Sequence, residues 1–161
     1  MSYPSIADHG MIGDLQSVAL VATDGTIDWF CCPRFDSPSV FASILDDRRG
    51  GRFALAPVAP ARSTKQMYMP DTAILVTRFL SESGIAEVID FMPVDRPRVV
   101  SDRRRIVRVV RGIRGDVEFE ATVEPRFDYG RQAHKLHING TTAVFESDGQ
   151  RLFLTSLSPL E

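Results

Sequence analysis

Cysteine and long apolar runs are both scarce in this chain of 161 residues. Its two cysteines, Cys31 and Cys32, are adjacent, and neighbouring residues rarely form a disulfide because the small ring strains the S–S torsion. There is no second cysteine pair that could complete a zinc site. No apolar run approaches the roughly 20 residues that span a bilayer, and the first residues do not resemble a secretory leader. These absences predict a reduced, cytoplasmic protein that enters no membrane.

Neither sign of charge dominates the composition. The formal net charge is −2, from 19 basic and 21 acidic residues. A nucleic-acid-binding protein needs a basic face that displaces counterions from phosphates, so no nucleic-acid partner is expected. The one basic cluster is interpreted as a solvated strand entry and the outer face of a strand, with an anion or nucleic-acid site as the alternative. Its residues are Arg103, Arg104, Arg105, Arg108, Arg111 and Arg114.

Helical periodicity is scarce, whereas short strand-like runs separated by Gly, Pro, Asn and Asp recur along the chain. Hairpins are predicted where turn residues join two such runs. The segments expected to be strands include residues 18–22, 26–30, 73–80, 85–92, 117–124, 135–138, 142–146 and 151–156. Only residues 39–45 suggest a short helix, with Pro38 early in the segment and Ser37 or Ser39 as an N-cap. The pattern predicts an all-β fold, an antiparallel β-sandwich of two packed sheets.

Residues that could carry out catalysis or bind a metal are few. The chain has three histidines; His134 and His137 would point to opposite faces of a strand and cannot share a metal, so no metal site is predicted. Nucleotide-binding and nucleophile-elbow signatures are absent. Glycoside hydrolysis needs two carboxyl groups about 5 to 9.5 Å apart, and spacing along a β-rich chain does not establish which carboxylates converge. The candidates are Asp28, Asp36, Asp90, Asp95 and Asp128.

Residues 28–41 form the segment richest in aromatic and charged side chains, and they include the only tryptophan. Sugars are held by aromatic rings and by charged groups that form paired hydrogen bonds to hydroxyls. The candidate residues for contact with a substrate or another domain are Trp29, Arg34, Phe35, Asp36 and Ser37. The alternative is that the rings are core residues and that Arg34 and Asp36 only fix the loop. The tetrapeptide at residues 33–36, Pro-Arg-Phe-Asp, recurs at residues 125–128.

Several motifs occur in an order that matches a known family. They are Ile12-Gly13-Asp14, Asp24-Gly25-Thr26-Ile27-Asp28-Trp29, Pro33-Arg34-Phe35-Asp36-Ser37-Pro38-Ser39-Val40-Phe41, Gly50-Gly51-Arg52-Phe53, Asp90-Phe91-Met92-Pro93 and Pro125-Arg126-Phe127-Asp128-Tyr129-Gly130. Together they resemble the opening of bacterial glycoside hydrolase family 15 enzymes, and most closely the trehalase-like branch of that glucoamylase and trehalase family. The resemblance implies a supersandwich-like N-terminal domain followed by an (α/α)6 barrel, in which two glutamates hydrolyse the substrate with inversion.

The resemblance sets the expectations for function. Residues 1–161 are expected to be a truncated N-terminal β-sandwich domain without the catalytic barrel, so no catalytic residue is assigned within the chain. Its expected partner is its own C-terminal barrel, and the substrate of the parent enzyme is trehalose or a related α-glucoside. Phosphate and magnesium are implied only for a full-length trehalase. The isolated chain is expected to self-associate through uncovered surface. The alternative is a stand-alone carbohydrate-binding or protein-interaction module.

Overall fold

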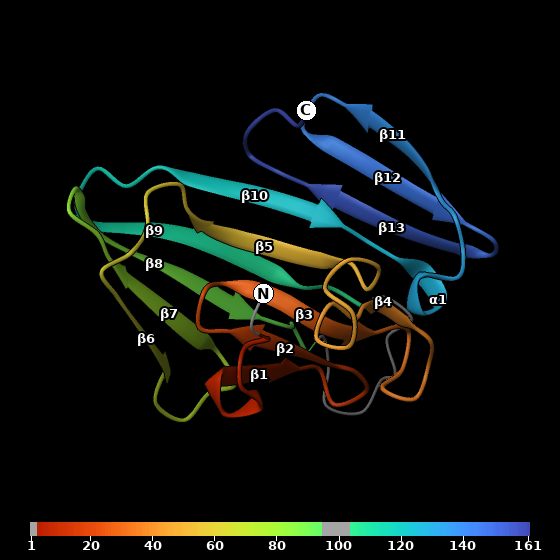
Figure 1. Cartoon of the computed structure of the whole chain (residues 1–161), viewed down its shortest axis with the longest axis horizontal. Coiled ribbons are helices and arrows are strands. Elements are labelled where there is room, and N and C mark those ends of the chain that lie inside the picture. The colour runs from red at the N-terminus through yellow and green to blue at the C-terminus, as the bar shows by residue number, and fades with distance from the viewer. Residues whose placement is uncertain (1–2, 95–103) are drawn as a thin grey trace.

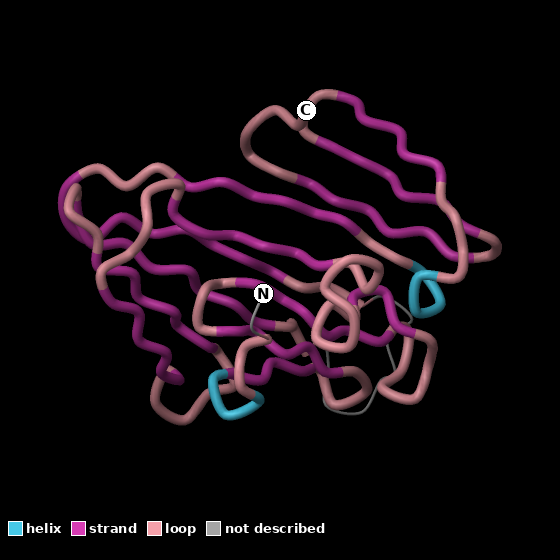
Figure 2. The backbone as a smooth tube through the Cα atoms, in the orientation of Figure 1, coloured by secondary structure: helices cyan, strands magenta, loops and turns pink. Residues whose placement is uncertain are grey.

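The computed structural model describes residues 3–94 and 104–161, which form mostly antiparallel strands (Figure 1). Helix within these residues is confined to two short turns (Figure 2), and none of it is long and apolar enough to cross a membrane. The elements are η1 (Ile6–Asp8), β1 (His9–Gly13), β2 (Val18–Ala22), β3 (Thr26–Cys31), β4 (Ser39–Phe41), β5 (Arg52–Pro57), β6 (Ser63–Tyr68), β7 (Leu75–Leu80), β8 (Gly84–Phe91), β9 (Val107–Gly115), β10 (Phe119–Glu124), α1 (Phe127–Gly130), β11 (Lys135–Asn139), β12 (Thr142–Ser147) and β13 (Gln150–Thr155).

The strands build three sheets. Sheet A has the order β1-β2-β3-β5-β10, with β4 also paired to β3; sheet B has the order β6-β7-β8-β9; sheet C has the order β11-β12-β13. Neighbouring strands pair antiparallel. The predicted all-β, antiparallel sandwich is therefore confirmed, but its strands form three sheets among the described residues rather than the two that the sequence predicted. The predicted hairpins β2–β3, β7–β8, β11–β12 and β12–β13 are also present.

Sheets A and B face each other, and sheet C packs on the same core through α1. Alternate side chains of a strand point to opposite faces, so one face of each sheet supplies the core. One buried cluster joins Leu55 of sheet A to Phe79 and Val88 of sheet B. A larger cluster includes residues of all three sheets and of α1: Ile12, Ala19, Val21, Ile27, Phe30, Val40, Phe41, Leu75, Met92, Phe127, Ala143 and Phe145. The described residues thus bury two separate apolar clusters, and the larger one joins all three sheets.

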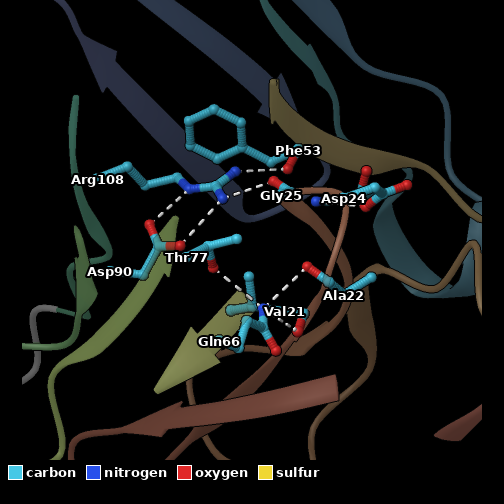
Figure 3. Close-up of polar contacts among 10 residues, drawn as sticks. Val21, Ala22, Asp24, Gly25, Phe53, Gln66, Thr77, Asp90 and Arg108 are labelled. Carbon is cyan, nitrogen blue, oxygen red and sulfur yellow. Dashed lines mark hydrogen bonds and ion pairs between the residues drawn. The ribbon is translucent and has the colours of Figure 1, made fainter. Parts of the chain in front are cut away.

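Polar side chains of sheet B also bind sheet A across this core (Figure 3). Arg108, whose side chain is 2% exposed, donates from Nε to Asp90 at 2.8 Å and from Nη1 and Nη2 to the carbonyls of Phe53 and Gly25 at 2.7 and 2.6 Å. Its guanidinium also lies 4.8 Å from the centre of the Phe53 ring. Nearby, the Gln66 amide donates to the carbonyls of Val21 and Ala22. These bonds join the two layers at defined positions.

The prediction of a short helix at residues 39–45 is wrong. Residues 39–41 form strand β4, which pairs with β3, and all three are buried. Val40 favours a strand because its β-branched side chain restricts rotamers in a helix, and its carbonyl accepts from Arg126 instead of from a following helical turn. The chain then reverses, with Asp46 Oδ1 accepting from the amides of Arg48 and Arg49.

The interpretation of the basic cluster as solvated side chains is wrong at two positions. Arg108 points into the sandwich, and Arg104, whose side chain is 6% exposed, donates to the carbonyl of Pro33 at 2.7 Å. Arg111 does lie on the outer face and pairs with Glu87. Arg103 lies outside the described residues. Sequence reasoning failed at Arg108 because side chains of β9 alternate between the two faces of the sheet. Arg108 therefore points inward, where it pairs with Asp90 of β8.

Replacing Arg108 with Met is expected to destabilise the fold by about 3 to 5 kcal/mol, since it leaves the buried Asp90 carboxylate without its countercharge. Urea unfolding followed by circular dichroism would measure the change. Arg62→Ala is the control, because it breaks an exposed Arg62–Glu82 pair and should leave the midpoint nearly unchanged. Equal midpoints for the two variants would contradict the role given to Arg108.

Candidate functional site

A β-bulge in sheet A places Asp28 beside Trp29. On β2 and β3, Leu20 pairs with Trp29 and Val21 pairs with Ile27, so Asp28 is the extra residue. Bulges redirect side chains and are frequent next to functional sites. Trp29 lies opposite Leu20, on the face of sheet A that points away from sheet B. The bulge therefore brings the only tryptophan and a carboxylate to the outer side of the sandwich.

The carboxylate of Asp28 pairs with His9 of β1. His9 Nε2 and Asp28 Oδ2 are 2.7 Å apart, and the two side chains are only 2% and 5% exposed. His9 Nδ1 lies 2.9 Å from the carbonyl of Ser5. A carbonyl can only accept, so Nδ1 carries a proton, and the pair holds a second proton between Nε2 and Oδ2. The other oxygen, Asp28 Oδ1, is buried and has no hydrogen-bond partner among the described residues.

Burial and pairing have opposite effects on the pKa of each member of the His9–Asp28 pair. Burial lowers the pKa of the His9 ring, but the hydrogen bond and charge of Asp28 and two backbone carbonyls together raise that pKa above its ordinary value. Burial raises the pKa of Asp28, and the bond to His9 opposes this effect. Both groups therefore retain the shared proton more strongly than in the unfolded chain.

A left-handed turn brings Tyr129 against Trp29. Asp128, Tyr129 and Gly130 in α1 all have positive φ, at 49°, 57° and 76°. Consecutive left-handed residues other than glycine cost roughly 1–2 kcal/mol each, and such strain concentrates at functional positions. The Trp29 and Tyr129 rings are tilted at 47° with centroids 6.3 Å apart, and Arg131 lies over the Tyr129 ring at 5.5 Å.

Four of the predicted contact residues, Arg34 to Ser37, lie on a loop whose tip is exposed and which leads into β4. Arg34 and Asp36 form a paired ion contact with side chains 65% and 48% exposed, and Phe35 is 69% exposed. The pair lowers the pKa of Asp36 through its hydrogen bond to Arg34. Ser37 Oγ accepts from the Arg34 amide at 3.1 Å, and the Phe35 amide donates to the carbonyl of Gln16. The loop is thus internally fixed while Phe35 projects outward.

The candidate carboxylates are distributed rather than gathered. Asp28 binds His9, Asp36 binds Arg34, and Asp90 binds Arg108 inside the sandwich. Asp128 lies in the left-handed turn, and Asp95 lies outside the described residues. Over residues 3–94 and 104–161, no group of three or more potential ligand side chains could hold a metal ion.

Trp29 is half-buried, which does not decide between a core residue and a sugar platform. The His134 ring packs between the rings of Phe127 and Phe145, at centroid distances of 5.8 and 5.5 Å. Burial, with a smaller effect from Arg126, lowers the pKa of His134.

Sequence reasoning missed the His9–Asp28 pair and the role of Tyr129. The one available signal was the Asp-Tyr-Gly of residues 128–130, a composition compatible with a left-handed turn.

The fold and the site define an all-β module with a fixed loop tip and an outward tryptophan. The comparisons with known proteins identify it further: the model of the family "Trehalase-like, N-terminal" matches residues 2–156. The chain belongs to this family, as its sequence motifs predicted. A search of solved structures found no match.

Curated relatives of the chain are named trehalases. The trehalase of Mycolicibacterium smegmatis is 34% identical over 152 residues, covering 86% of this chain and 23% of the relative. The trehalase of Thermoplasma volcanium is 33% identical over 160 residues, covering 98% and 26% respectively. That of Mycobacterium tuberculosis is 32% identical over 143 residues, covering 80% and 21%. The chain thus spans about a quarter of their length or less, and in these relatives the domain precedes a catalytic region.

The His9–Asp28 pair should make stability depend on pH. Because folding raises the pKa of His9, its contribution is fully present below about pH 6.5 and is lost as pH rises through the higher folded value. The free energy of unfolding, measured by urea titration, should therefore fall as the pH rises above about 6.5. His9→Gln should cost about 3 kcal/mol at pH 6 and flatten this slope.

His137→Gln is the matched control, because His137 lies on the exposed strand β11 and its replacement should leave the slope intact. NMR titration of the His9 ring gives a second test. The resonance should titrate above the usual histidine range, and Asp28→Asn should move the midpoint down. An unchanged midpoint in Asp28→Asn would rule out the pair as the cause.

Proposed function

We propose that this chain is the non-catalytic N-terminal domain of an inverting α-glycosidase that hydrolyses trehalose or a related α-glucoside. The observation that carries the proposal is the family match over residues 2–156, together with relatives that are named trehalases. The domain would support the catalytic region that follows it in those relatives, an (α/α)6 barrel in the family that the motifs resemble. The two free cysteines, Cys31 and Cys32, support a cytoplasmic enzyme.

The distribution of carboxylates supports a non-catalytic role. Hydrolysis of a glycosidic bond needs two carboxyl groups flanking the bond, one as acid and one as base. Among the candidates in described positions, three are each engaged by a basic side chain from another position. The acid and the base of the reaction are therefore assigned to the catalytic region. The phosphate and magnesium that the trehalase branch implies are likewise expectations for the longer enzyme.

We further propose that the segment of residues 33–41, a loop that leads into β4, lies at the junction with the catalytic region and shapes the mouth of its active site. The Arg34–Asp36 pair holds the loop outward, and Phe35 is mostly exposed at its tip. An exposed aromatic ring on an internally fixed loop is suited to packing against another surface, because little conformational freedom is lost on contact.

A stand-alone carbohydrate-binding module is the alternative. Its support is the outward Trp29 beside Tyr129, which is 40% exposed. Aromatic rings of this kind can stack against the apolar faces of sugars. Against it, Arg131 already lies over the Tyr129 ring, which leaves less ring surface for a ligand.

Glucose release from trehalose and maltose, measured for this chain and for the longer protein that joins it to its catalytic region, tests the proposal. We expect activity only in the longer protein, with the preferred sugar identifying the substrate. Activity in the 161-residue chain would overturn the non-catalytic assignment. Sugar-dependent fluorescence of Trp29 in the isolated chain, with no activity in the longer protein, would favour the binding module.

The loop proposal has its own test. In the longer protein, replacing Phe35 with Ala should lower kcat/KM for the preferred sugar by about tenfold, an effect near 1.4 kcal/mol, while thermal stability changes little. Phe153→Ala is a suitable control, because Phe153 is also exposed, at 67%, but lies on sheet C. Identical kinetics for wild type and Phe35→Ala would place the loop away from the active site.

A further inference from the structure

We propose that the outer face of sheet B, an apolar surface bordered by a row of net positive charge, is the surface on which the catalytic region docks, and that the matching surface of the catalytic region carries an acidic rim. This inference rests on the proposed function, because it takes the catalytic region as the partner. It concerns strands β6 to β9, which are separate from the loop of residues 33–41. Figure 1 shows these four strands forming one side of the sandwich.

The strand registers align four apolar side chains in a row across sheet B. Met67 pairs with Val76, Val76 with Ile89, and Ile89 with Val109. The sequence neighbours of these residues point into the sandwich, since Gln66 and Arg108 bind carbonyls of sheet A. Side chains alternate between faces, so the row faces outward. We call it the apolar row.

The apolar row is exposed at both ends. Met67 is 42% and Val109 is 44% exposed, whereas Val76 in the centre is only 6% exposed. The same face carries a second set of apolar residues, each two positions from a member of the apolar row. They are Met69, Ile74, Phe91 and Val107. A continuous apolar surface across four strands is unusual on a face exposed to water and marks an interaction site.

A charged row borders the apolar row on the same face. Lys65 pairs with Arg78, Arg78 with Glu87, and Glu87 with Arg111. Glu87 is 1% exposed and accepts from Arg78 Nε at 2.7 Å and from Arg111 Nε at 3.1 Å. Hydrogen bonds to the two arginines lower its pKa despite its burial. Three cations and one anion give this row a net charge of +2, which favours a partner with acidic side chains at its edge.

The same charge argues against a second copy as the partner. Two copies meeting through this face would bring two rows of the same net charge together, and like charges across an interface oppose association. The self-association that the sequence predicts for the isolated chain is therefore expected to use another surface. The relatives supply another partner, because this domain accounts for only 21% to 26% of their length. The region that follows the domain in those relatives is large enough to cover a face of four strands.

Oxidation of Met67 by hydrogen peroxide, followed by mass spectrometry of its peptide, tests the docking directly. Methionine oxidation follows exposure, so Met67 should oxidise about tenfold more slowly in the longer protein than in the 161-residue chain. Equal rates in the two proteins would overturn the proposal. Slow oxidation in the isolated chain at high but not at low concentration would also overturn it, because a second copy would then cover the face.

A charge introduced into the apolar row gives the second test. In the longer protein, Val109→Asp should repel the acidic rim and restore fast oxidation of Met67. Phe153→Asp, on the outer face of sheet C, should leave Met67 protected. Val109 is 44% exposed in the domain alone, so the substitution is compatible with its folding. Protection of Met67 that persists in Val109→Asp would contradict docking at this face.

The same preparations separate this inference from the proposed function. A longer protein that protects Met67 but releases no glucose from trehalose or maltose would reject the proposed substrate class and retain the docking surface. A longer protein that hydrolyses one of these sugars while Met67 stays as reactive as in the isolated chain would retain the function and reject the docking surface.

Discussion

The spacing of sheets A and B depends on one buried guanidinium. Arg108 reaches across the sandwich to two carbonyls of sheet A while its charge is balanced by Asp90 of its own sheet. Apolar contacts are non-directional and do not by themselves select one alignment of the two layers, whereas hydrogen bonds to defined carbonyls do. The turn at Gly25, the strand β5 and the bulge at Asp28 are therefore placed relative to sheet B by this contact.

Turn chemistry and alternation predicted those strands that are joined by short Gly- or Asn-containing turns, such as β11–β12 across Asn139-Gly140. They did not predict contacts between distant positions. His9 and Asp28 meet because the bulge adds one residue to β3, and no local sequence pattern predicts that bulge. The helix prediction for residues 39–45 failed for a related reason. The local preference of this segment for a helix was weaker than the stabilisation gained by burying β4 on both sides.

The repeated Pro-Arg-Phe-Asp shows how far context outweighs sequence. Phe35 is 69% exposed in the first copy, whereas Phe127 is 1% exposed in the second. Asp36 binds its neighbouring arginine, while Asp128 adopts a left-handed backbone. The difference comes from what surrounds each copy. β4 and sheet C enclose the second copy, whereas the first copy lies exposed to solvent. Local sequence could therefore identify the candidate loop but not the direction of its side chains.

The main core cluster joins Ile12 of β1 to Phe145 of β12, so its members come from nearly opposite ends of the chain. During synthesis, the first strands emerge long before the last ones exist. Their apolar faces must wait uncovered, which is when aggregation and chaperone capture compete with folding. A topology rich in such long-range contacts also folds slowly. For this domain, the order in which its strands leave the ribosome is thus a constraint on yield as well as on shape.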